Sequence, residues 1–286
     1  MLRVIGCVAA IGVISGTGLA ADKEPETLPF TGQWVVNYDQ DACHLLAQFG
    51  QGDDQVILRF TRYQPGADTF NLALMAKRLR SDAPTAAVKL DFGLSGQPSR
   101  YSGMRGNVGE RPAVFIRSVR LDGWQGEGKA PVISPEQEER INGLTIAVGT
   151  KQPFRLTFKS LGKPMIAMRA CLTNLEKGWG YDPDALAHLS RWSSPLTSPQ
   201  SWFSDNDYPK KALESYHNGF VQFRLDVDVE GKVAGCYILD RTNPDEFADS
   251  VCRLLTRRAK LLPALDAERR LARSYFISSI WFKVAE

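Results

Sequence analysis

The clearest alternation of apolar and polar positions lies near the end of the chain. Apolar residues occupy every odd position from 221 to 229, whereas Gln222, Arg224 and Asp226 fall between them. A period of two predicts a β-strand with one buried face and one face in water. We therefore expect a strand over residues 220–229 whose polar side chains are solvated.

Further elements are predicted on both sides of this strand. A tight turn at residues 230–232 leads into a hairpin partner over residues 233–239. The other expected elements are a short helix that begins at residues 208–213 and ends at Asn218 and Gly219, a helix that starts at the Asn-Pro-Asp-Glu sequence 243–246, and a last strand over residues 275–284.

Short apolar patches separated by Gly and Pro run through the first half of the chain, which is typical of short antiparallel strands. Ser134 followed by Pro135 predicts the start of a short helix, and residues 164–177 predict a longer one. Residues 22–29 are polar and predict a loose lead-in. The expected strands cover residues 34–38, 43–49, 56–62, 70–76, 88–90, 114–119, 144–148 and 154–158, the last two as a hairpin.

Residues 193–207 are rich in Ser and Pro and predict a linker. A short helix over residues 183–192 precedes it, and Trp202 and Phe203 predict that the linker is partly docked. The expected fold class is α+β. The expected organisation is a leader over residues 1–21, a mostly antiparallel β domain of unknown function with one or two helices over residues 30–178, a short helix and linker over residues 179–205, and a domain with two helices and a three-stranded antiparallel sheet over residues 206–286.

The leader has the pattern of a secretory signal. Arg3 is followed by the apolar run 4–14 and by small residues before Asp22. Cleavage after Ala20 or Ala21 fits this pattern. The alternative is an uncleaved helix that anchors the protein in the inner membrane, because the uncharged stretch of 18 residues approaches the length that spans a bilayer. We favour the cleaved signal, since the second half of the stretch is rich in glycine.

Cleavage of the signal would change the number of cysteines in the exported chain. Removing Cys7 leaves four, and an even number in an oxidising compartment predicts two disulfides. Three pairings are possible, and four buried free thiols are the alternative. The domain plan favours the pairs that stay within one domain, Cys43 with Cys171 and Cys236 with Cys252.

The composition excludes several classes of protein. The chain has 286 residues, of which 43% are hydrophobic and 23% are charged, and a formal net charge of +3. These ordinary values exclude a disordered chain, a collagen and a polytopic membrane protein. The small positive charge argues against a nucleic-acid partner, because proteins that bind nucleic acids usually carry a clear basic excess.

No catalytic residue, cofactor or metal site is predicted. His44, His188 and His217 lie in different segments without the paired spacing of zinc ligands. The sequence has no G-x-S-x-G elbow and no P-loop. Cys43 and His44 are adjacent in a predicted strand and point to opposite faces, so the histidine cannot activate that cysteine. We therefore predict that the protein is not an enzyme.

Basic residues suggest two further binding hypotheses. The glycine-rich segment 103–109 is expected to form a loop between strands, where Arg105 could touch an anion. The basic run 253–260 fits lipid headgroups or an acidic partner, but we favour a solvated helix end. An enzyme in the first domain would need a pocket with polar groups clustered among Arg59, Arg62, Arg105, Arg117 and Asp122.

Three stretches in the last 81 residues follow the order helix, long strand, hairpin partner, helix and last strand. They are YPKKALESYHNGFVQFRLDVDVEGKVAGCYIL, DEFADSVCRLLTRRAKLLPA and SYFISSIWFKV. Taken together, residues 206–286 resemble the C-terminal domain of TonB, the energy transducer of outer-membrane uptake in Gram-negative bacteria. The cysteine pair Cys236 and Cys252 is similar to that of a subset of TonB-like domains in exported proteins.

The resemblance implies a periplasmic protein that binds an outer-membrane receptor or another envelope protein by strand addition, with a link to TonB-type transmembrane transport. A free sheet edge offers N–H and C=O groups that a partner strand satisfies. The chain lacks TonB's long Glu-Pro and Lys-Pro spacer and the histidine of its membrane anchor, which argues against energy transduction. The alternatives are a structural or scaffolding envelope protein and an enzyme with its site in the first domain. The implied partner-binding residues are Tyr208, Pro209, Tyr275, Phe276, Ile277, Ile280, Trp281 and Phe282.

Overall fold

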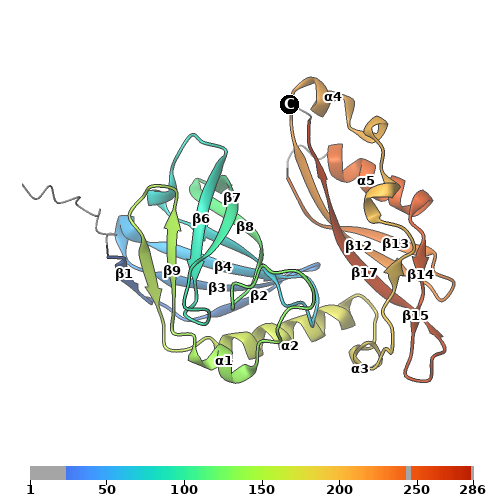
Figure 1. Cartoon of the computed structure of the whole chain (residues 1–286), viewed down its shortest axis with the longest axis horizontal. Helices are drawn as coiled ribbons and strands as arrows, with labels where there is room; N and C mark the ends of the chain where they lie inside the picture. Colours follow the sequence, from blue (N-terminus) through green and yellow to red (C-terminus); the bar gives the residue numbers. More distant parts are fainter. Residues whose placement is uncertain (1–23, 243–245, 285–286) are drawn as a thin grey trace, which may run out of the picture.

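The two larger β-sheets of the protein lie side by side, as Figure 1 shows. The computed structural model describes residues 24–242 and 246–284. Ten of the described strands form one sheet, here called the large sheet, and three form a second, here called the small sheet. Five helices accompany the strands in the described part of the chain, so the fold is α+β. The expected signal at 1–21 and the expected helix start at 243–245 lie outside the described residues.

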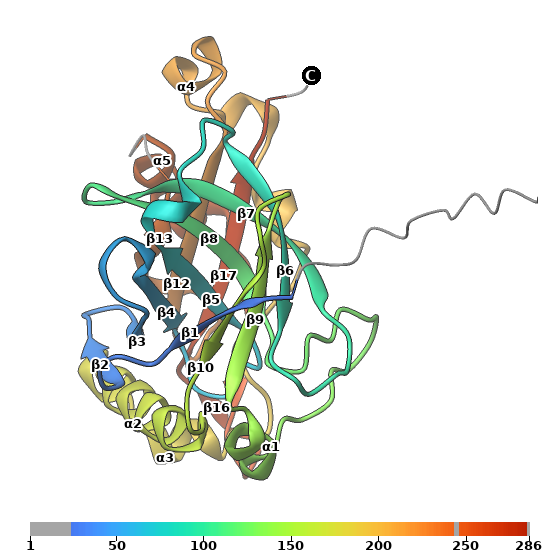
Figure 2. The same cartoon turned by 90° about the vertical axis from the view of Figure 1, so that its left-hand side faces the viewer.

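The large sheet is curled and almost entirely antiparallel (Figure 2). Its strands in chain order are β1 (Glu26–Pro29), β2 (Val35–Tyr38), β3 (Cys43–Phe49), β4 (Val56–Arg62), β5 (Phe70–Met75), β6 (Thr85–Asp91), β7 (Ser99–Val108), β8 (Arg111–Val119), β9 (Gly143–Val148) and β10 (Phe154–Thr157). In the sheet they follow the order β1-β10-β9-β6-β7-β8-β5-β4-β3-β2, and only β1 and β10 pair in parallel. Phe30, which follows β1, bridges to Phe49 in β3 and so brings the two ends of the sheet together.

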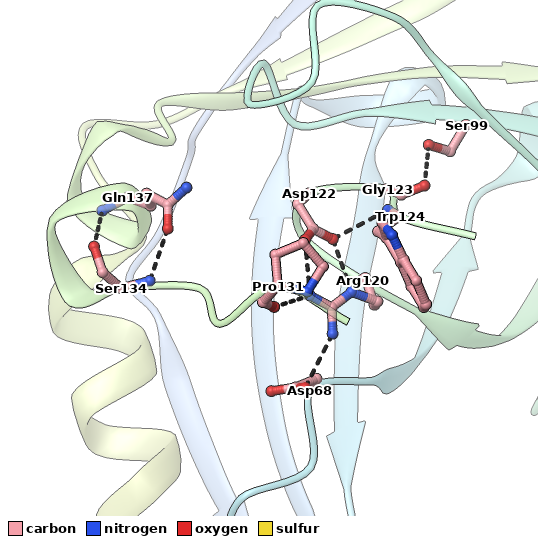
Figure 3. Close-up of polar contacts among 9 residues, drawn as sticks. All are labelled: Asp68, Ser99, Arg120, Asp122, Gly123, Trp124, Pro131, Ser134 and Gln137. Atoms are coloured by element: carbon pink, nitrogen blue, oxygen red, sulfur yellow. Dashed lines mark hydrogen bonds and ion pairs between the residues drawn. The ribbon is translucent and has the colours of Figure 1, made fainter. Parts of the chain in front are cut away.

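Two helices cover one end of the curled sheet (Figure 1). The first, α1 (Pro135–Arg140), begins as predicted: the Gln137 N–H donates to the Ser134 hydroxyl, and the Ser134 N–H donates to the Gln137 side chain (Figure 3). The second, α2 (Gly162–Gly178), packs on β2 and β3.

A continuous apolar core fills the inside of the large sheet, with Phe49 and Phe60 among its fully buried side chains. The predicted disulfide between Cys43 in β3 and Cys171 in α2 is confirmed, and both cysteines are buried in this core. The helix that covers the core is therefore covalently tied to the sheet.

The small sheet is backed by one helix (Figure 1). Its strands are β12 (Gly219–Val227), β13 (Val233–Arg241) and β17 (Ser274–Phe282), paired antiparallel in the order β13-β12-β17. The helix is α5 (Glu246–Arg258), and the predicted disulfide from Cys236 in β13 to Cys252 in α5 is also confirmed. Two disulfides favour an oxidising compartment.

Short elements connect and flank the two sheets. In the described residues no helix has the length and apolar character needed to cross a membrane. The short elements are α3 (Pro183–Ala187), α4 (Lys210–Glu214), β11 (Ser194–Pro195), β14 (Leu261–Leu262), β15 (Ala264–Leu265), β16 (Leu271–Ala272) and the 3-10 turns η1 (Gly52–Asp54), η2 (Lys77–Leu79), η3 (Pro199–Trp202) and η4 (Asp205–Asp207).

Residues 193–207 are docked onto the small sheet along much of their length. Within them, β11 pairs with β14, and Trp202 is buried in the core between the small sheet and α5. The ring of Phe203 packs edge-on against that of Phe282, with 6.1 Å between the ring centres. These aromatic side chains hold the segment in place despite its Ser and Pro content.

Three local predictions were wrong. Residues 26–29 are not a loose lead-in, because β1 pairs with β10 and completes the large sheet. The glycine-rich segment 103–109 is not a loop, because residues 99–108 form β7 between β6 and β8. A Cβ atom on Gly103 would lie 2.5 Å from the Val114 side chain, so this glycine permits close packing within the sheet. The helix expected over 183–192 ends at Ala187.

Candidate functional site

The outer edge of β17 is the first candidate site. β17 pairs with β12 over nine residues, from Gly219 opposite Phe282 to Val227 opposite Ser274. No other described strand pairs with β17, so β17 forms one edge of the small sheet. In an antiparallel strand, alternate residues direct their N–H and C=O groups toward the free side. This edge can therefore accept a further strand.

The ends of this strand are packed against other parts of the protein. Tyr275 is 2% exposed, and its hydroxyl donates a 2.6 Å hydrogen bond to Glu176 of α2. Burial raises the pKa of Tyr275, and burial also raises the pKa of Glu176. Phe282 is 6% exposed in the core between the small sheet and α5. The side chains of Tyr275 and Phe282 are thus part of the folded interior.

The middle of β17 presents two different faces. Phe276 and Ile280 are partly buried against the core under α5. Ile277 and Trp281 lie on the opposite face, which is turned toward the large sheet, and Trp281 is 46% exposed. Among the residues on β17 that the resemblance implies, Trp281 has the most accessible side chain.

Tyr208 and Pro209 lie at the start of α4. The Tyr208 ring packs edge-on against Phe247 and Phe282, with 5.7 Å between ring centres in each case, and its hydroxyl donates to the His217 carbonyl. Pro209 precedes the first turn of α4, where its missing N–H costs nothing. Both residues thus brace the end of β17 from the α5 side.

An ion pair fixes the segment before Tyr208 onto the end of α5. Arg258 donates to both carboxylate oxygens of Asp207, at 2.5 and 3.1 Å, and the Ser204 N–H donates to the same carboxylate at 2.8 Å. The bond from Arg258, above all, lowers the pKa of Asp207 to about 2.

This ion pair predicts a pH-dependent contribution to stability. Because the pKa of Asp207 is lower in the folded protein than the ordinary 3.8, its stabilising effect is present above about pH 4 and is lost as the pH falls toward 2. We expect Asp207→Asn to lower the urea midpoint at pH 7 and to have little effect near pH 2. The exposed Asp205→Asn is the control. A difference between wild type and Asp207→Asn that stays constant from pH 7 to 2 would contradict the assignment.

A cleft between the two sheets is the second candidate site. Its volume is about 730 Å³, and it lies between the outer face of the large sheet and the end of β13. Three of the five residues considered for a site in the first domain line it: Arg59 of β4, Arg105 of β7 and Arg117 of β8. These arginines come from non-consecutive parts of the sequence and are brought together by the strand order of the sheet.

The other two residues of that set do not line the cleft. Arg62 lies over the Phe70 ring at 6.0 Å. Asp122 accepts hydrogen bonds at 2.8 and 2.7 Å from Arg120, which also pairs with Asp68 (Figure 3). The Asp122 carboxylate is thus committed to a structural cluster around the buried Arg120.

Two of the three cleft arginines are also engaged. Arg105 donates to the Leu79 carbonyl at 2.6 Å, which fixes its guanidinium at the rim. Arg117 pairs with Asp240 of β13 at 3.0 Å and stacks 3.5 Å from the centre of the Phe220 ring. Arg117 therefore joins the large sheet to the small sheet.

A second arginine also joins the sheets. Arg224 belongs to β12 of the small sheet, whereas Arg117 belongs to the large sheet. The side chain of Arg224 is 3% exposed and lies between the rings of Trp179 and Tyr237, 3.9 and 4.1 Å from their centres. It donates to Asp226 at 3.0 Å, and its Nη1 lies 3.7 Å from Asp41, which precedes β3. The expectation that the polar face of β12 is solvated was wrong at this position, because the first half of the chain packs against it.

The cysteine and histidine at 43–44 point to opposite faces, as predicted. Cys43 is buried in its disulfide, whereas His44 lines the cleft with its Nδ1 2.9 Å from the Thr61 hydroxyl. Burial and, after it, the nearby Arg59 lower the pKa of His44. In residues 24–242 and 246–284, no three His, Cys, Asp or Glu side chains are grouped so that they could hold a metal ion.

The resemblance indicates the last strand, β17, as the partner-binding edge, whereas nothing in the sequence indicates how the cleft is assembled. Comparison with family models, curated proteins and solved structures finds no match to this chain.

Proposed function

We propose that this is an exported periplasmic protein with a TonB-like C-terminal domain, which binds an extended segment of an envelope protein along β17. The observation that supports the proposal best is that β17 pairs on one side only over its nine residues. A partner strand would satisfy the outward N–H and C=O groups of that edge. An outer-membrane receptor is the partner that the resemblance favours, with a link to TonB-type transport.

The surroundings of β17 suit this role. Both faces near the edge carry apolar side chains, with Phe276 and Ile280 on one and Ile277 and Trp281 on the other. A partner strand with alternating apolar residues would contact both pairs. The disulfide-bonded Cys236 and Cys252 hold β13 to α5, so the sheet is braced on the side away from the proposed contact.

The test is amide hydrogen exchange, followed by NMR, on the full mature chain with and without a TonB-box peptide. Outward amides between Phe276 and Phe282 are expected to exchange rapidly in the free protein. Because only alternate amides point outward, the peptide should protect every second residue of this stretch. The amides that pair with β12 are the internal control, since they are already protected in the free protein.

Two results would contradict strand addition at β17. One is protection confined to β13, the other edge of the small sheet. The other is no protection at peptide concentrations up to solubility. If instead the same alternate amides become protected by raising the protein concentration alone, the edge serves self-association, as the scaffolding alternative requires.

A further inference from the structure

The cleft between the sheets contains an arginine without a partner. Arg59 makes no hydrogen bond or ion pair with any described residue, and its Nε is buried. Arg117 also has a buried Nε without a partner, although its Nη2 pairs with Asp240. The side chain of Arg59 is only partly buried and lines the cleft. An anion in the cleft would supply the hydrogen bonds that its guanidinium group lacks.

The sheet register places this arginine in one row with apolar side chains. Arg59 is opposite Ala73 of β5, Ala73 is opposite Phe115 of β8, and Phe115 is opposite Met104 of β7. These four residues thus form one cross-strand row along the floor of the cleft, and neighbouring strands lie about 4.8 Å apart. Ala73, Phe115 and Met104 are apolar, so they offer an apolar group of a ligand a contact surface beside the charge of Arg59.

Both arginines and aspartates line the cleft. His44 is neutral at pH 7, because burial lowers its pKa. One of the aspartates, Asp41, is also faced from outside the cleft by Arg224, at 3.7 Å. Since Arg105 donates to the Leu79 carbonyl and Arg117 pairs with Asp240, it is the fork of Arg59 that we expect to hold the ligand, which suits a monoanion better than a dianion such as phosphate.

We propose that this cleft binds a small monocarboxylate with an aromatic or apolar tail, held at its carboxylate by Arg59 and at its tail by Ala73 and Phe115. The planar guanidinium fork matches a carboxylate through two parallel hydrogen bonds. The volume of about 730 Å³ lies within the range of small-molecule sites. This site is independent of strand addition, since it lies at the end of β13, on the edge of the small sheet opposite β17.

Phenylacetate is the probe, and the full mature chain is the protein. Calorimetric titration should give a dissociation constant on the order of 1 mM, as expected for a ligand of about ten heavy atoms. The Arg59 Nε–Hε signal in ¹⁵N NMR spectra should shift as phenylacetate is added. Phenylacetamide, which lacks the charge, and inorganic phosphate, which lacks the tail, should each bind at least about tenfold more weakly, a difference of about 1.4 kcal/mol.

Matched variants separate Arg59 from a general charge effect. Arg59→Met should weaken phenylacetate binding at least about tenfold, and Arg59→Lys should weaken it by a smaller factor, since it keeps the charge and loses the fork. Arg100→Met removes an exposed arginine of β7 outside the cleft and should leave binding unchanged. If Arg59→Met does not fold, Arg59→Lys carries the test.

Four results would overturn the proposal. They are no binding of phenylacetate at 20 mM (~20 times the expected constant), equal binding by wild type and both Arg59 variants, equal losses in Arg59→Met and Arg100→Met, and phosphate binding as tight as that of phenylacetate. Since none of these measurements involves a peptide, they leave the proposal for β17 unaffected.

Discussion

Replacing Cys43 and Cys171 together by alanine is expected to lower the free energy of unfolding by about 5 kcal/mol, the largest effect of any change proposed for this protein. The two cysteines are 128 residues apart in the sequence, and the bond between them restricts the unfolded chain more than a short loop would. Chemical unfolding at equilibrium, followed by tryptophan fluorescence, measures the difference.

The second disulfide provides a matched comparison. Cys236 and Cys252 are 16 residues apart, so alanine at both positions is expected to cost about 3 kcal/mol. The order of the two effects follows from loop length, and a larger loss for the Cys236 and Cys252 pair would contradict it. Both double variants must be compared under oxidising conditions, where the remaining disulfide stays intact.

Replacing Arg224 by methionine is expected to destabilise the protein by about 3 kcal/mol, because removing one partner of a buried ion pair leaves the other uncompensated. Methionine keeps an aliphatic chain between Trp179 and Tyr237 but removes the charge that Asp226 and Asp41 face. The carboxylates are partly exposed, which places the estimate at the lower end of the usual range for buried pairs.

The control for this variant is Arg253→Met, which removes an exposed arginine from α5. Urea unfolding should separate the two variants clearly. Small-angle scattering adds a second measurement, since losing Arg224 should allow the sheets to separate and the radius of gyration to rise. Equal unfolding midpoints for the two variants would show that Arg224 does not hold the sheets together.

The alternation around Arg224 shows what a local pattern can and cannot predict. A period of two correctly indicates that β12 is a strand, because the period depends only on backbone geometry. It does not indicate what covers the polar face. Arg224 is polar in the sequence, yet it is buried because Trp179 and Asp41, which are distant in the chain, supply its partners.

The glycine-rich strand β7 could not be identified from propensity. Gly103 and Gly106 favour a loop when the segment is considered alone. In the sheet, Gly103 lies against Val114, so it is the neighbouring strand that selects a residue without a side chain. Tertiary context here overrides local preference, and only the strand order contains that information.

The cleft arginines illustrate the same limit for function. Arg59 and Arg117 were considered together from the sequence, but their strands, β4 and β8, are separated there by three others. They share a cleft because the sheet order places β5 between β4 and β8. Arg62 is only three residues from Arg59, yet it lies outside the cleft, because residues at odd spacing in a strand point to opposite faces.

The parallel pairing of β1 with β10 has a consequence for the order of folding. Glu26 lies opposite Phe154, and Cys43 is bonded to Cys171. If the chain is exported as proposed, the large sheet cannot close until nearly all of residues 26–171 have left the translocation channel. Such non-local closure slows folding. A chain exported from its N-terminus would meanwhile expose the Cys43 thiol to oxidants. Correct maturation then requires that a premature bond at this thiol be reversible, so we expect its yield to depend on disulfide exchange.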